Sequence, residues 1–576
     1  MIKKLMKSLR EFKTATILTP LFVTFEVILE VLIVYFTATL VDDGINAGNL
    51  SVILKMGGIL SVMAIISLIF GTLSGDYCAK SSAGFTKNLR RDLFEKIQSF
   101  SFKNIDKFKS SGLVTRLTTD TIHIKMAFQM IIRIAVRAPL MLIFSFIMIL
   151  KINSDIAMKF LIIIPIMFVG LMIIARFAMP YFKKTFEEYD HLNNVVSENL
   201  NGIRVVKSFT QEDYEIRKFN GVSGYIYKLF KKANDILAFN GPLMQGSIYA
   251  AILFISYIGA QMITVGNLTT GELMSLFSYI MQVLGSLMML SMVFIMIVIS
   301  KESCIRVCEI LDEEIDIVNN KEPITEIKDG SIKFDNVGFS YVNKKDKLCL
   351  ENINLEIKSG EKIGIIGGTG SGKSSLISLI PRLYDVTTGN LYIGSVNVKD
   401  YDLYSLREAV SVVLQKNVLF GGTLDENLKW GNKDANLDDI KEVCDISCSS
   451  EFIEHMDNKY TSKIEQGGTN VSGGQKQRLC IARALLKKPK ILILDDSTSA
   501  VDTKTDRNIW KGMEKYLPDT TKIIIAQRIS SVENCDRIIV MDNGKINGIG
   551  THSELLKNNN IYKEVFESQQ GGGLGE

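Results

Sequence analysis

Six apolar segments crowd the first 300 residues, and no other feature of the sequence restricts the fold as strongly. A transmembrane helix needs about 20 consecutive, mainly apolar residues. Because the bilayer core offers no water to the backbone, such segments must be helical. The rest of the chain has globular composition, so a membrane half and a soluble half are predicted. The spans are expected near 16–41, 52–76, 127–150, 156–179, 236–265 and 273–300.

The links between the spans alternate in charge, and this alternation predicts the topology. The links at 42–49 and 266–272 contain no Lys or Arg, whereas those near 77–126 and 180–235 are rich in both. Lysines also fill the N-terminus. Cytoplasmic segments carry an excess of Lys and Arg, so the N-terminus, both long links and everything after residue 300 are expected in the cytoplasm. The formal net charge of +4 is too small to indicate a nucleic-acid partner.

Both long links have the pattern of helical arms rather than loops. Apolar residues such as Leu89, Leu93 and Ile97 recur at helical spacing with polar residues between them. Each arm is expected to continue a spanning helix and to turn back at a tip, near 107–120 in the first link and 204–215 in the second. Such arms are suited to contact a separate soluble domain. A solvated linker is the alternative, and the amphipathic spacing weighs against it.

Four ionisable side chains lie within the expected spans. Glu26 and Glu30 are one helical turn apart in the first span, and Arg133 and Arg137 are equally spaced in the third. Charges at membrane depth are costly and usually face a water-filled cavity or each other. One interpretation is that Glu26 and Glu30 attract a cationic substrate. The alternatives are ion pairing with another helix or, for the arginines, a place at the membrane interface.

A glycine-rich loop in the second half fits the G-x-x-x-x-G-K-[ST] pattern for phosphate binding. An apolar run at 362–366 precedes the loop, and a helix-like run follows it. The glycines let backbone N–H groups close around phosphate oxygens, Lys373 can reach the β- and γ-phosphates, and Ser374 can hold Mg²⁺. The chain is therefore predicted to bind a nucleoside triphosphate. The candidate contacts in this loop are Gly367, Gly368, Thr369, Gly370, Ser371, Gly372, Lys373, Ser374 and Ser375.

Further candidate nucleotide contacts lie on either side of this loop. Tyr341 could stack its ring on adenine, although taken alone such a residue would more often be core. Gln415, between an apolar strand and a loop, could contact Mg²⁺ or water. A second anion site is predicted at the start of a helix, where N–H groups and a hydroxyl are available. It comprises Val471, Ser472, Gly473, Gly474 and Gln475.

Two carboxylates end a buried strand-like run at 491–494. Asp495 is placed to hold Mg²⁺ through water, and Asp496 follows it directly. A further strand-like run at 522–526 ends at Gln527. A chain with one phosphate loop and a second anion site makes sense if that second site serves a nucleotide on another subunit.

The order of these motifs resembles that of an ATP-binding cassette (ABC) domain. The order is the phosphate loop, Gln415, Ser472-Gly473-Gly474-Gln475, the strand-terminal Asp495 and the final strand. With six spans before that domain, the whole chain resembles a half-transporter of the bacterial ABC multidrug-exporter type. The resemblance implies an α-helical polytopic membrane domain with long cytoplasmic extensions, fused to an α/β P-loop nucleotide-binding domain. The implied boundaries are a membrane domain at 1–310, a linker at 311–330 and the nucleotide-binding domain at 331–570.

The same resemblance implies the cofactors and partners. ATP and Mg²⁺ are the expected cofactors, and the expected partners are the lipid bilayer, an amphipathic small-molecule substrate and a second half-transporter chain. Each of two ATP molecules would lie between the phosphate loop of one chain and the signature Ser472–Gln475 of the other. The tips near 107–120 and 204–215 would act as coupling helices that press on the loop containing Gln415.

The chain departs from the family pattern at two positions. The family usually has a Glu where Asp496 stands, which polarises the attacking water, and a His where Gln527 stands, which contacts the γ-phosphate. Asp is shorter than Glu by one C–C bond, roughly 1.5 Å. Losing a well-placed base typically costs about 10²–10⁴-fold in rate. With Gln415, these two residues are the catalytic candidates.

Both departures lie in the pocket built on the chain's own phosphate loop. The signature Ser472–Gln475, which serves the opposite pocket, is intact. The chain resembles the degenerate subunit of a heterodimeric ABC exporter, in which its own pocket hydrolyses ATP slowly. The alternative is a homodimer in which Asp496 serves as a slower but adequate base.

The expected function is ATP-driven export of amphipathic small molecules across a bacterial plasma membrane. A peptide or lipid exporter is the runner-up, because apolar spans do not distinguish these substrates. A third alternative is an ATP-gated regulatory subunit that does not pump. The intact signature and the coupling tips weigh against that third alternative.

Overall fold

Two compact units make up the chain. The first comprises Met1–Ser99 and Phe108–Glu313, and the second comprises Phe100–Lys107 and Glu314–Glu576, so the chain enters the second unit twice. The domain boundaries expected from the sequence stay predictions. The structure is a computed structural model, and the residues that it describes are 1–342, 347–497 and 501–571.

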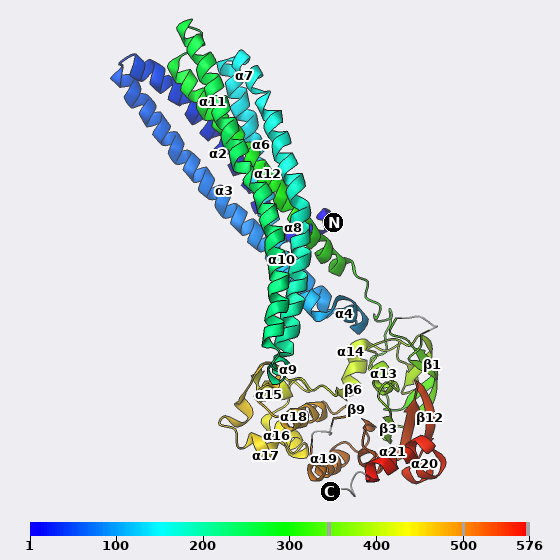
Figure 1. Ribbon diagram of the computed structural model, residues 1–576. Helices are drawn as coiled ribbons and strands as arrows, with labels where there is room; N and C mark the ends of the chain where they lie inside the picture. Colours follow the sequence, from blue (N-terminus) through cyan, green and yellow to red (C-terminus); the bar gives the residue numbers. More distant parts are fainter. Residues whose placement is uncertain (343–346, 498–500, 572–576) are drawn as a thin grey trace. The chain divides into compact units, whose positions relative to one another are not determined.

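Long helices build the first unit (Figure 1). Within the described residues, six helical stretches are long and apolar enough to cross a membrane, which confirms the six expected spans. The long helices are α2 (Lys13–Thr39), α3 (Leu50–Gln98), α6 (Thr121–Ile152), α8 (Ile163–Asn201), α10 (Glu212–Ala238), α11 (Asn240–Thr264) and α12 (Thr270–Asp312). The shorter segments are α1 (Ile2–Leu5), η1 (Met6–Phe12), η2 (Leu40–Asn46), α5 (Ser110–Thr115), η3 (Arg116–Asp120), α7 (Ser154–Phe160) and α9 (Ile203–Ser208).

The two long polar links are helical, as the amphipathic spacing predicted. α3 begins at a cap in which the Asn49 side chain accepts from the N–H groups of Ser51 and Val52. It contains the second span and continues into the first long link as far as Gln98, and its 49 residues measure about 74 Å at 1.5 Å per residue. The second link is carried by α8 and α10. The helices break at α4 (Phe102–Phe108), α5 and α9, at or beside the predicted tips.

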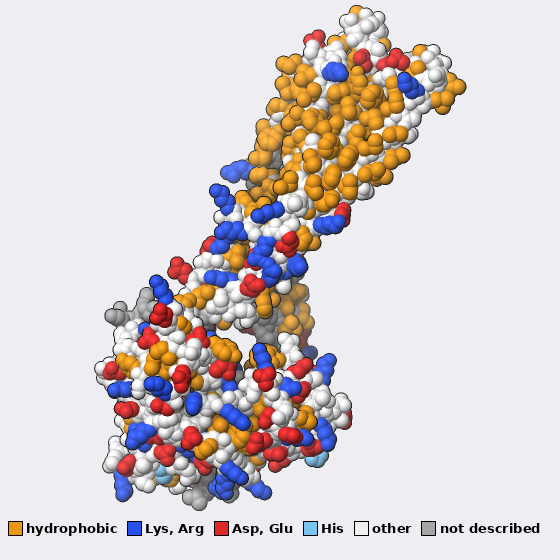
Figure 2. Space-filling view, turned by 180° about the vertical axis from the view of Figure 1, so that it is seen from behind, with side chains coloured by type: hydrophobic (Ala, Val, Ile, Leu, Met, Phe, Trp, Pro, Cys, Tyr) orange, Lys and Arg blue, Asp and Glu red, His pale blue; other side chains and the backbone are white. Residues whose placement is uncertain are grey.

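The core of the first unit lies among α2, α6, α7, α8, α11 and α12, where side chains such as Val27, Ile149, Phe160, Ile255 and Tyr279 are fully buried. Many other apolar side chains of these helices are exposed, as expected of a surface that faces lipid. Figure 2 shows them as a continuous apolar face over the spans.

Three sheets form the second unit. The six-stranded sheet has the order β12-β11-β3-β10-β9-β6, the four-stranded sheet has the order β2-β1-β4-β5, and β7 pairs with β8. The strands of the six-stranded sheet are β3 (Lys362–Gly367), β6 (Val410–Val413), β9 (Ile491–Asp495), β10 (Thr521–Ile525), β11 (Arg537–Asp542) and β12 (Lys545–Gly550). The others are β1 (Ile332–Phe339), β2 (Leu350–Ile357), β4 (Thr388–Ile393), β5 (Val396–Asn397), β7 (Gly422–Thr423) and β8 (Lys463–Ile464).

The register of the six-stranded sheet brings three loops to one edge. β10 runs parallel to both β3 and β9, with Ile525 opposite Ile365 on one side and Asp495 on the other. Parallel strands end at the same edge of a sheet, and ligands of open α/β sheets bind outside the carboxyl ends of the strands. The residues that follow β3, β9 and β10 are therefore neighbours.

Helices and a second sheet cover the two faces of this sheet, and each face has its own hydrophobic core. The core with the four-stranded sheet contains Phe334, Leu376 and Ile493, and the other contains Leu479, Leu494 and Ile524. The helices of this unit are α4, α13 (Lys373–Leu379), α14 (Leu403–Ala409), α15 (Leu424–Leu428), α16 (Leu437–Ile446), α17 (Ser450–Ile453), η4 (Lys459–Thr461), η5 (Gln466–Gly468), α18 (Gly473–Leu486), α19 (Thr503–Tyr516), η6 (Ile529–Ser531), α20 (His552–Asn558) and α21 (Asn560–Gly571).

Candidate nucleotide-binding site

The glycine-rich loop lies between β3 and α13, in the strand–loop–helix setting that the motif requires. Gly372 takes the left-handed conformation, with φ at +97°, directly before the helix. A Cβ atom at this position would lie 2.7 Å from Leu350 Cδ2, so both the backbone conformation and the lack of space require glycine. The loop thus presents its backbone N–H groups to an anion at the start of a helix.

Lys373 folds back over the loop. Its Nζ donates to the carbonyl oxygens of Gly367 and Gly368, both at 2.8 Å. Burial lowers the pKa of the Lys373 ammonium, and the nearby carboxylates of Asp495 and Asp496 oppose that shift. To reach the phosphates of a nucleotide, this ammonium must exchange its two carbonyl partners for phosphate oxygens.

Two oxygen ligands face each other across the loop. The Ser374 hydroxyl donates to Asp495 Oδ2 at 3.2 Å, and Asp495 is the last residue of β9 and is buried. Burial raises the pKa of the Asp495 carboxyl, and the charge of Asp496 adds to this effect. A hydroxyl and a carboxylate in this arrangement are the hard oxygen donors that Mg²⁺ prefers.

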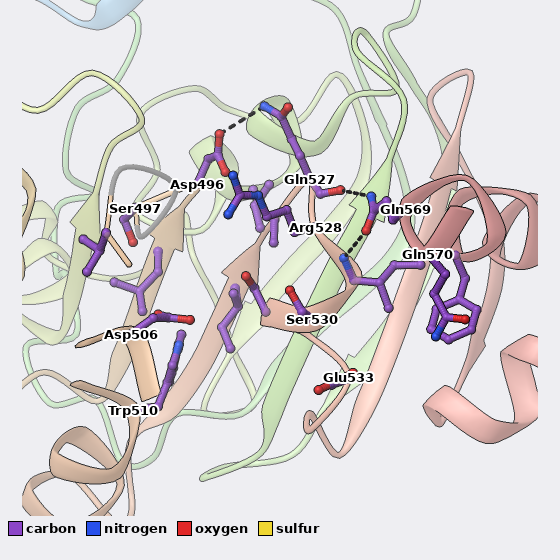
Figure 3. A pocket seen from close by; sticks show the side chains of 18 residues that line it. Asp496, Ser497, Asp506, Trp510, Gln527, Arg528, Ser530, Glu533, Gln569 and Gln570 are labelled. Carbon is purple, nitrogen blue, oxygen red and sulfur yellow. Dashed lines mark hydrogen bonds between the residues drawn. The ribbon is translucent and has the colours of Figure 1, made fainter. Parts of the chain in front are cut away.

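The three catalytic candidates from the sequence meet at one carboxylate oxygen. The Gln527 side-chain amide donates to Asp496 Oδ2 at 3.0 Å, and the Gln415 amide donates to the same oxygen at 3.4 Å. Figure 3 shows the bond between Asp496 and Gln527. Asp496 has a left-handed backbone, with φ at +48°, a conformation that aspartate adopts more readily than most residues other than glycine. Asp496 therefore sits at the centre of an amide–carboxylate cluster.

Tyr341 lies beside the loop, as predicted. Its hydroxyl is 2.9 Å from Ser375 Oγ, and its ring is half exposed. Edge-to-face contacts with Phe339 at 4.8 Å and Tyr384 at 5.2 Å fix the ring. An oriented and half-exposed aromatic ring thus lies beside the phosphate loop, as stacking on a base would require.

Tyr384 was not among the sequence candidates, yet it connects this ring to α4. Its hydroxyl donates to Asp106 Oδ2 at 2.8 Å, and its ring lies 6.0 Å from that of Phe102. Burial and the neighbouring Asp106 carboxylate raise the pKa of the Tyr384 hydroxyl. Since Asp106 and Tyr384 are 278 positions apart, no local pattern could have indicated this contact.

The second predicted anion site begins α18. The Ser472 hydroxyl accepts from the N–H of Gln475 at 3.3 Å, and the Gln475 side chain accepts from the N–H of Ser472 at 2.9 Å. This reciprocal cap fixes the first turn of the helix. A Cβ at Gly473 would meet nothing within 4 Å, so the backbone at the helix start is open to an approaching group. Val471 is buried beneath it.

Comparisons with known proteins agree with this geometry. Residues 16–287 match the family described as ABC transporter transmembrane region, and residues 350–499 match the family described as ABC transporter. The chain is 34% identical over 534 residues to YfiB of Bacillus subtilis, described as an uncharacterized ABC transporter ATP-binding protein, with 93% of this chain and 92% of that protein covered. The chain belongs to the ABC transporter family.

Two further comparisons concern a flippase and an exporter of known structure. This ABC transporter is 30% identical over 575 residues to the ATP-dependent lipid A-core flippase of Haemophilus influenzae, with 99% of this chain and 97% of that protein covered. It also superimposes on a bacterial Atm1-family ABC exporter solved with ATP bound, with a TM-score of 0.84, 23% identity, and 97% and 98% of the two chains covered. The latter likeness supports the fold alone. The transporter is a membrane-embedded ATPase whose soluble unit binds ATP.

Three of the four ionisable residues singled out within the expected spans form ion pairs. Arg137 on α6 pairs with Glu26 on α2, and its Nη2 donates to both carboxylate oxygens of Glu30 at 2.8 Å. Arg133 reaches the carbonyl oxygen of Gly71 on α3 at 3.5 Å. Of the alternatives weighed from the sequence, the structure contains ion pairing between helices, while contact of Glu26 and Glu30 with a substrate stays a prediction.

Proposed function

We propose that this transporter is one half of a heterodimeric exporter and that the pocket on its own phosphate loop turns ATP over slowly. The observation that carries this proposal is the bonding at Asp496. A carboxylate that must take a proton from water has one of its oxygens, Oδ2, engaged by the amides of both Gln527 and Gln415. A general base acts within hydrogen-bond reach of the proton that it removes. The short side chain of Asp496 and its two amide partners both hinder the carboxylate from reaching the proton of the attacking water.

The role of Gln527 follows from the same bond. A neutral amide in this position can donate to a phosphate oxygen or to Asp496, and in this structure it donates to Asp496. Gln527 and Asp496 therefore act as a mutually hydrogen-bonded pair in place of the family's His and Glu. Such a pair can hold ATP between two chains while supporting slow hydrolysis.

Mg²⁺ would be held by Ser374 and Asp495, and Gln415 would contribute its side-chain carbonyl oxygen. The donor set supports this assignment, because Mg²⁺ is usually bound through one or two carboxylates plus substrate phosphates. Within the described residues there is no group of three or more His, Cys, Asp or Glu that could hold a metal ion without such phosphates. When bound, Mg²⁺ neutralises charge that develops on the phosphates.

The intact signature is the contribution of this chain to the partner's pocket. Ser472 and Gln475 cap α18 by engaging each other's N–H groups, and the N–H groups of Gly473 and Gly474 lie at the positive end of the helix dipole. In a head-to-tail dimer these groups would contact the γ-phosphate bound to the partner. The faster pocket would thus combine this signature with a phosphate loop that has the family's Glu and His.

The proposed substrates are amphipathic small molecules, exported across a bacterial plasma membrane with both termini of the chain in the cytoplasm. The lysine-rich N-terminus and long links support this orientation. A lipid substrate is the second candidate, because the transporter is 30% identical to a lipid A-core flippase over nearly its whole length. Stimulation of ATPase activity by lipids and by amphipathic cations, measured side by side in vesicles, would distinguish the two candidates.

The heterodimer proposal is tested with the full chain expressed alone and reconstituted in lipid nanodiscs. We expect a chain that binds ATP but hydrolyses it slowly, and whose turnover rises when the partner chain is co-expressed. A Lys373→Ala variant is the matched control, because it removes the phosphate-binding ammonium. Brisk ATP hydrolysis by a dimer of the lone chain, lost in that control, would show that Asp496 is an adequate base and that the transporter is a homodimer.

A further inference from the structure

A glutamine on the last described helix holds the backbone next to Gln527. The Gln569 side-chain N–H₂ donates to the carbonyl oxygen of Gln527 at 2.8 Å, and its Oε1 accepts from the N–H of Ile529 at 2.9 Å. One amide group thus satisfies a donor and an acceptor two residues apart, as a neighbouring strand would do. Figure 3 shows both bonds beside the bond between Gln527 and Asp496.

The segment held in this way borders a cavity. A cavity of about 670 Å³ is lined by residues of β9, β10, α19 and α21 and by the segment itself, including Asp496, Gln527, Arg528 and Ile529. Side chains that border a cavity lack part of the packing that fixes a close-packed interior. Fixed hydrogen bonds therefore matter more for the position of this segment than they would in a packed core.

The two hydrogen bonds of the Gln569 side chain hold the backbone that leads to the catalytic cluster. Ala526, directly before the segment, is anchored to β3 through its N–H bond to the Ile365 carbonyl oxygen at 3.3 Å. Beyond it the carbonyl of Gln527 and the N–H of Ile529 are held by α21. The direction of the Gln527 side chain, and hence its bond to Asp496, depends on both anchors.

We propose that Gln569 is a positioning residue that restrains ATP hydrolysis, because it clamps the backbone of 527–529 to α21 and so holds the Gln527 amide on Asp496 Oδ2. The C-terminal helix thereby acts on this pocket through the backbone of 527–529. The proposal concerns the chain's own pocket and holds whether the partner is a second copy or a different chain.

The test compares Gln569→Ala with Gln570→Ala in the full chain in lipid nanodiscs. Gln570 is the matched control, because it is the same residue type on the same helix and no hydrogen bond joins it to 527–529 among the described residues. Hydrogen exchange of peptides that contain Ile529 reports the clamp directly. We expect exchange of the Ile529 amide to rise about tenfold in Gln569→Ala, and to be unchanged in the control.

The same variants are assayed for hydrolysis in this pocket alone. Radiolabelled 8-azido-ATP is photo-crosslinked to the chain after timed incubation, and the fraction of crosslinked nucleotide converted to diphosphate gives the rate. We expect Gln569→Ala to raise this rate about three- to tenfold, because a loosened Gln527 engages Asp496 Oδ2 less often. The Kd for ATP should stay within about twofold, because the phosphate loop is held by β3 and α13. A lowered rate with normal ATP binding would overturn the proposal. Loss of ATP binding together with hydrolysis would indicate general destabilisation and would overturn it as well.

Two other results would also overturn it. Unchanged exchange at Ile529 in Gln569→Ala would show that the clamp does not hold the segment. Raised exchange with unchanged hydrolysis would show that the clamp is structural and does not position Gln527. The crosslinked nucleotide on this chain reports this pocket only, so the comparison between Gln569→Ala and its control does not depend on the partner. Equal rates on the two chains of the dimer would contradict the heterodimer proposal and leave that comparison unchanged.

Discussion

Restoring the family's two catalytic residues should accelerate hydrolysis in this chain's own pocket. The change is the double variant Asp496→Glu/Gln527→His. In the structure the Asp496 carboxylate is bound at Oδ2 by Gln527 at 3.0 Å and by Gln415 at 3.4 Å. Glutamate extends the carboxylate by roughly 1.5 Å, and the histidine removes the stronger of the two amide donors while offering a ring N–H to the γ-phosphate.

The size of the effect follows from these contacts. A well-placed general base is worth about 10²–10⁴-fold, or about 2.7–5.4 kcal/mol of barrier at 1.36 kcal/mol per factor of ten. Asp496 retains part of this benefit, so we expect an increase of about 10²-fold. Because Asp496 and Gln527 are hydrogen-bonded, the two changes should be non-additive. Each single variant should increase the rate less than about tenfold, since each leaves the other position without the family's residue.

Photo-crosslinked nucleotide on this chain again reports the rate. Asp438→Glu on α16 is the matched control, because it lengthens an exposed aspartate that does not contact the cluster. ATP binding should be equal in all variants. A double variant that binds ATP normally but hydrolyses it no faster than the natural chain would refute the reasoning, because the slow step would then lie outside these two positions.

Three further predictions concern other parts of the molecule. Tyr384→Ala should raise the Kd for ATP about two- to tenfold in a fluorescent-nucleotide titration, because an edge contact worth about 0.5–1.5 kcal/mol no longer fixes the adenine-facing tyrosine, whereas Tyr384→Phe should change it less. Arg137→Met should cost about 3–5 kcal/mol in unfolding experiments by stranding two carboxylates in the membrane, and adding Glu26→Gln and Glu30→Gln should recover most of this loss; full stability of the single variant would contradict the ion-pair assignment. Burial raises the pKa of Asp495, so this carboxyl takes up its proton at a higher pH than an exposed aspartate does; as the pH falls through that raised pKa, Mg²⁺-dependent ATP binding should weaken while Mg²⁺-independent binding persists.

Much of the fold could be predicted because its signals are local. Apolar length predicted the spans, and helical spacing predicted that the links continue as helices, as α3 does over 49 residues. The phosphate loop and the signature were recognisable because their residue types and offsets are fixed by backbone chemistry at a helix start. The roles of Lys373, Ser374 and Asp495 in binding nucleotide and metal remain predictions.

The parts that could not be predicted depend on contacts between distant positions. Nothing near Asp496 in the sequence indicates that Gln527, 31 positions away, donates to it. Nothing near Gln569 indicates that it holds the backbone 42 positions earlier. The substrate question was left open for a similar reason: whether Glu26 and Glu30 are available to a ligand depends on Arg137, which lies on another helix.

Phe100–Lys107 belong to the second unit although they come early in the chain, and this has a practical consequence. A fragment cut to contain only the C-terminal cassette would lack Asp106 and Phe102, so the hydroxyl of Tyr384 would lose its acceptor and its ring one aromatic neighbour. Nucleotide affinities measured on such a fragment would describe an incomplete pocket. A faithful minimal preparation would have to supply residues 100–107 as a separate peptide, and added peptide should tighten ATP binding only when Asp106 is present.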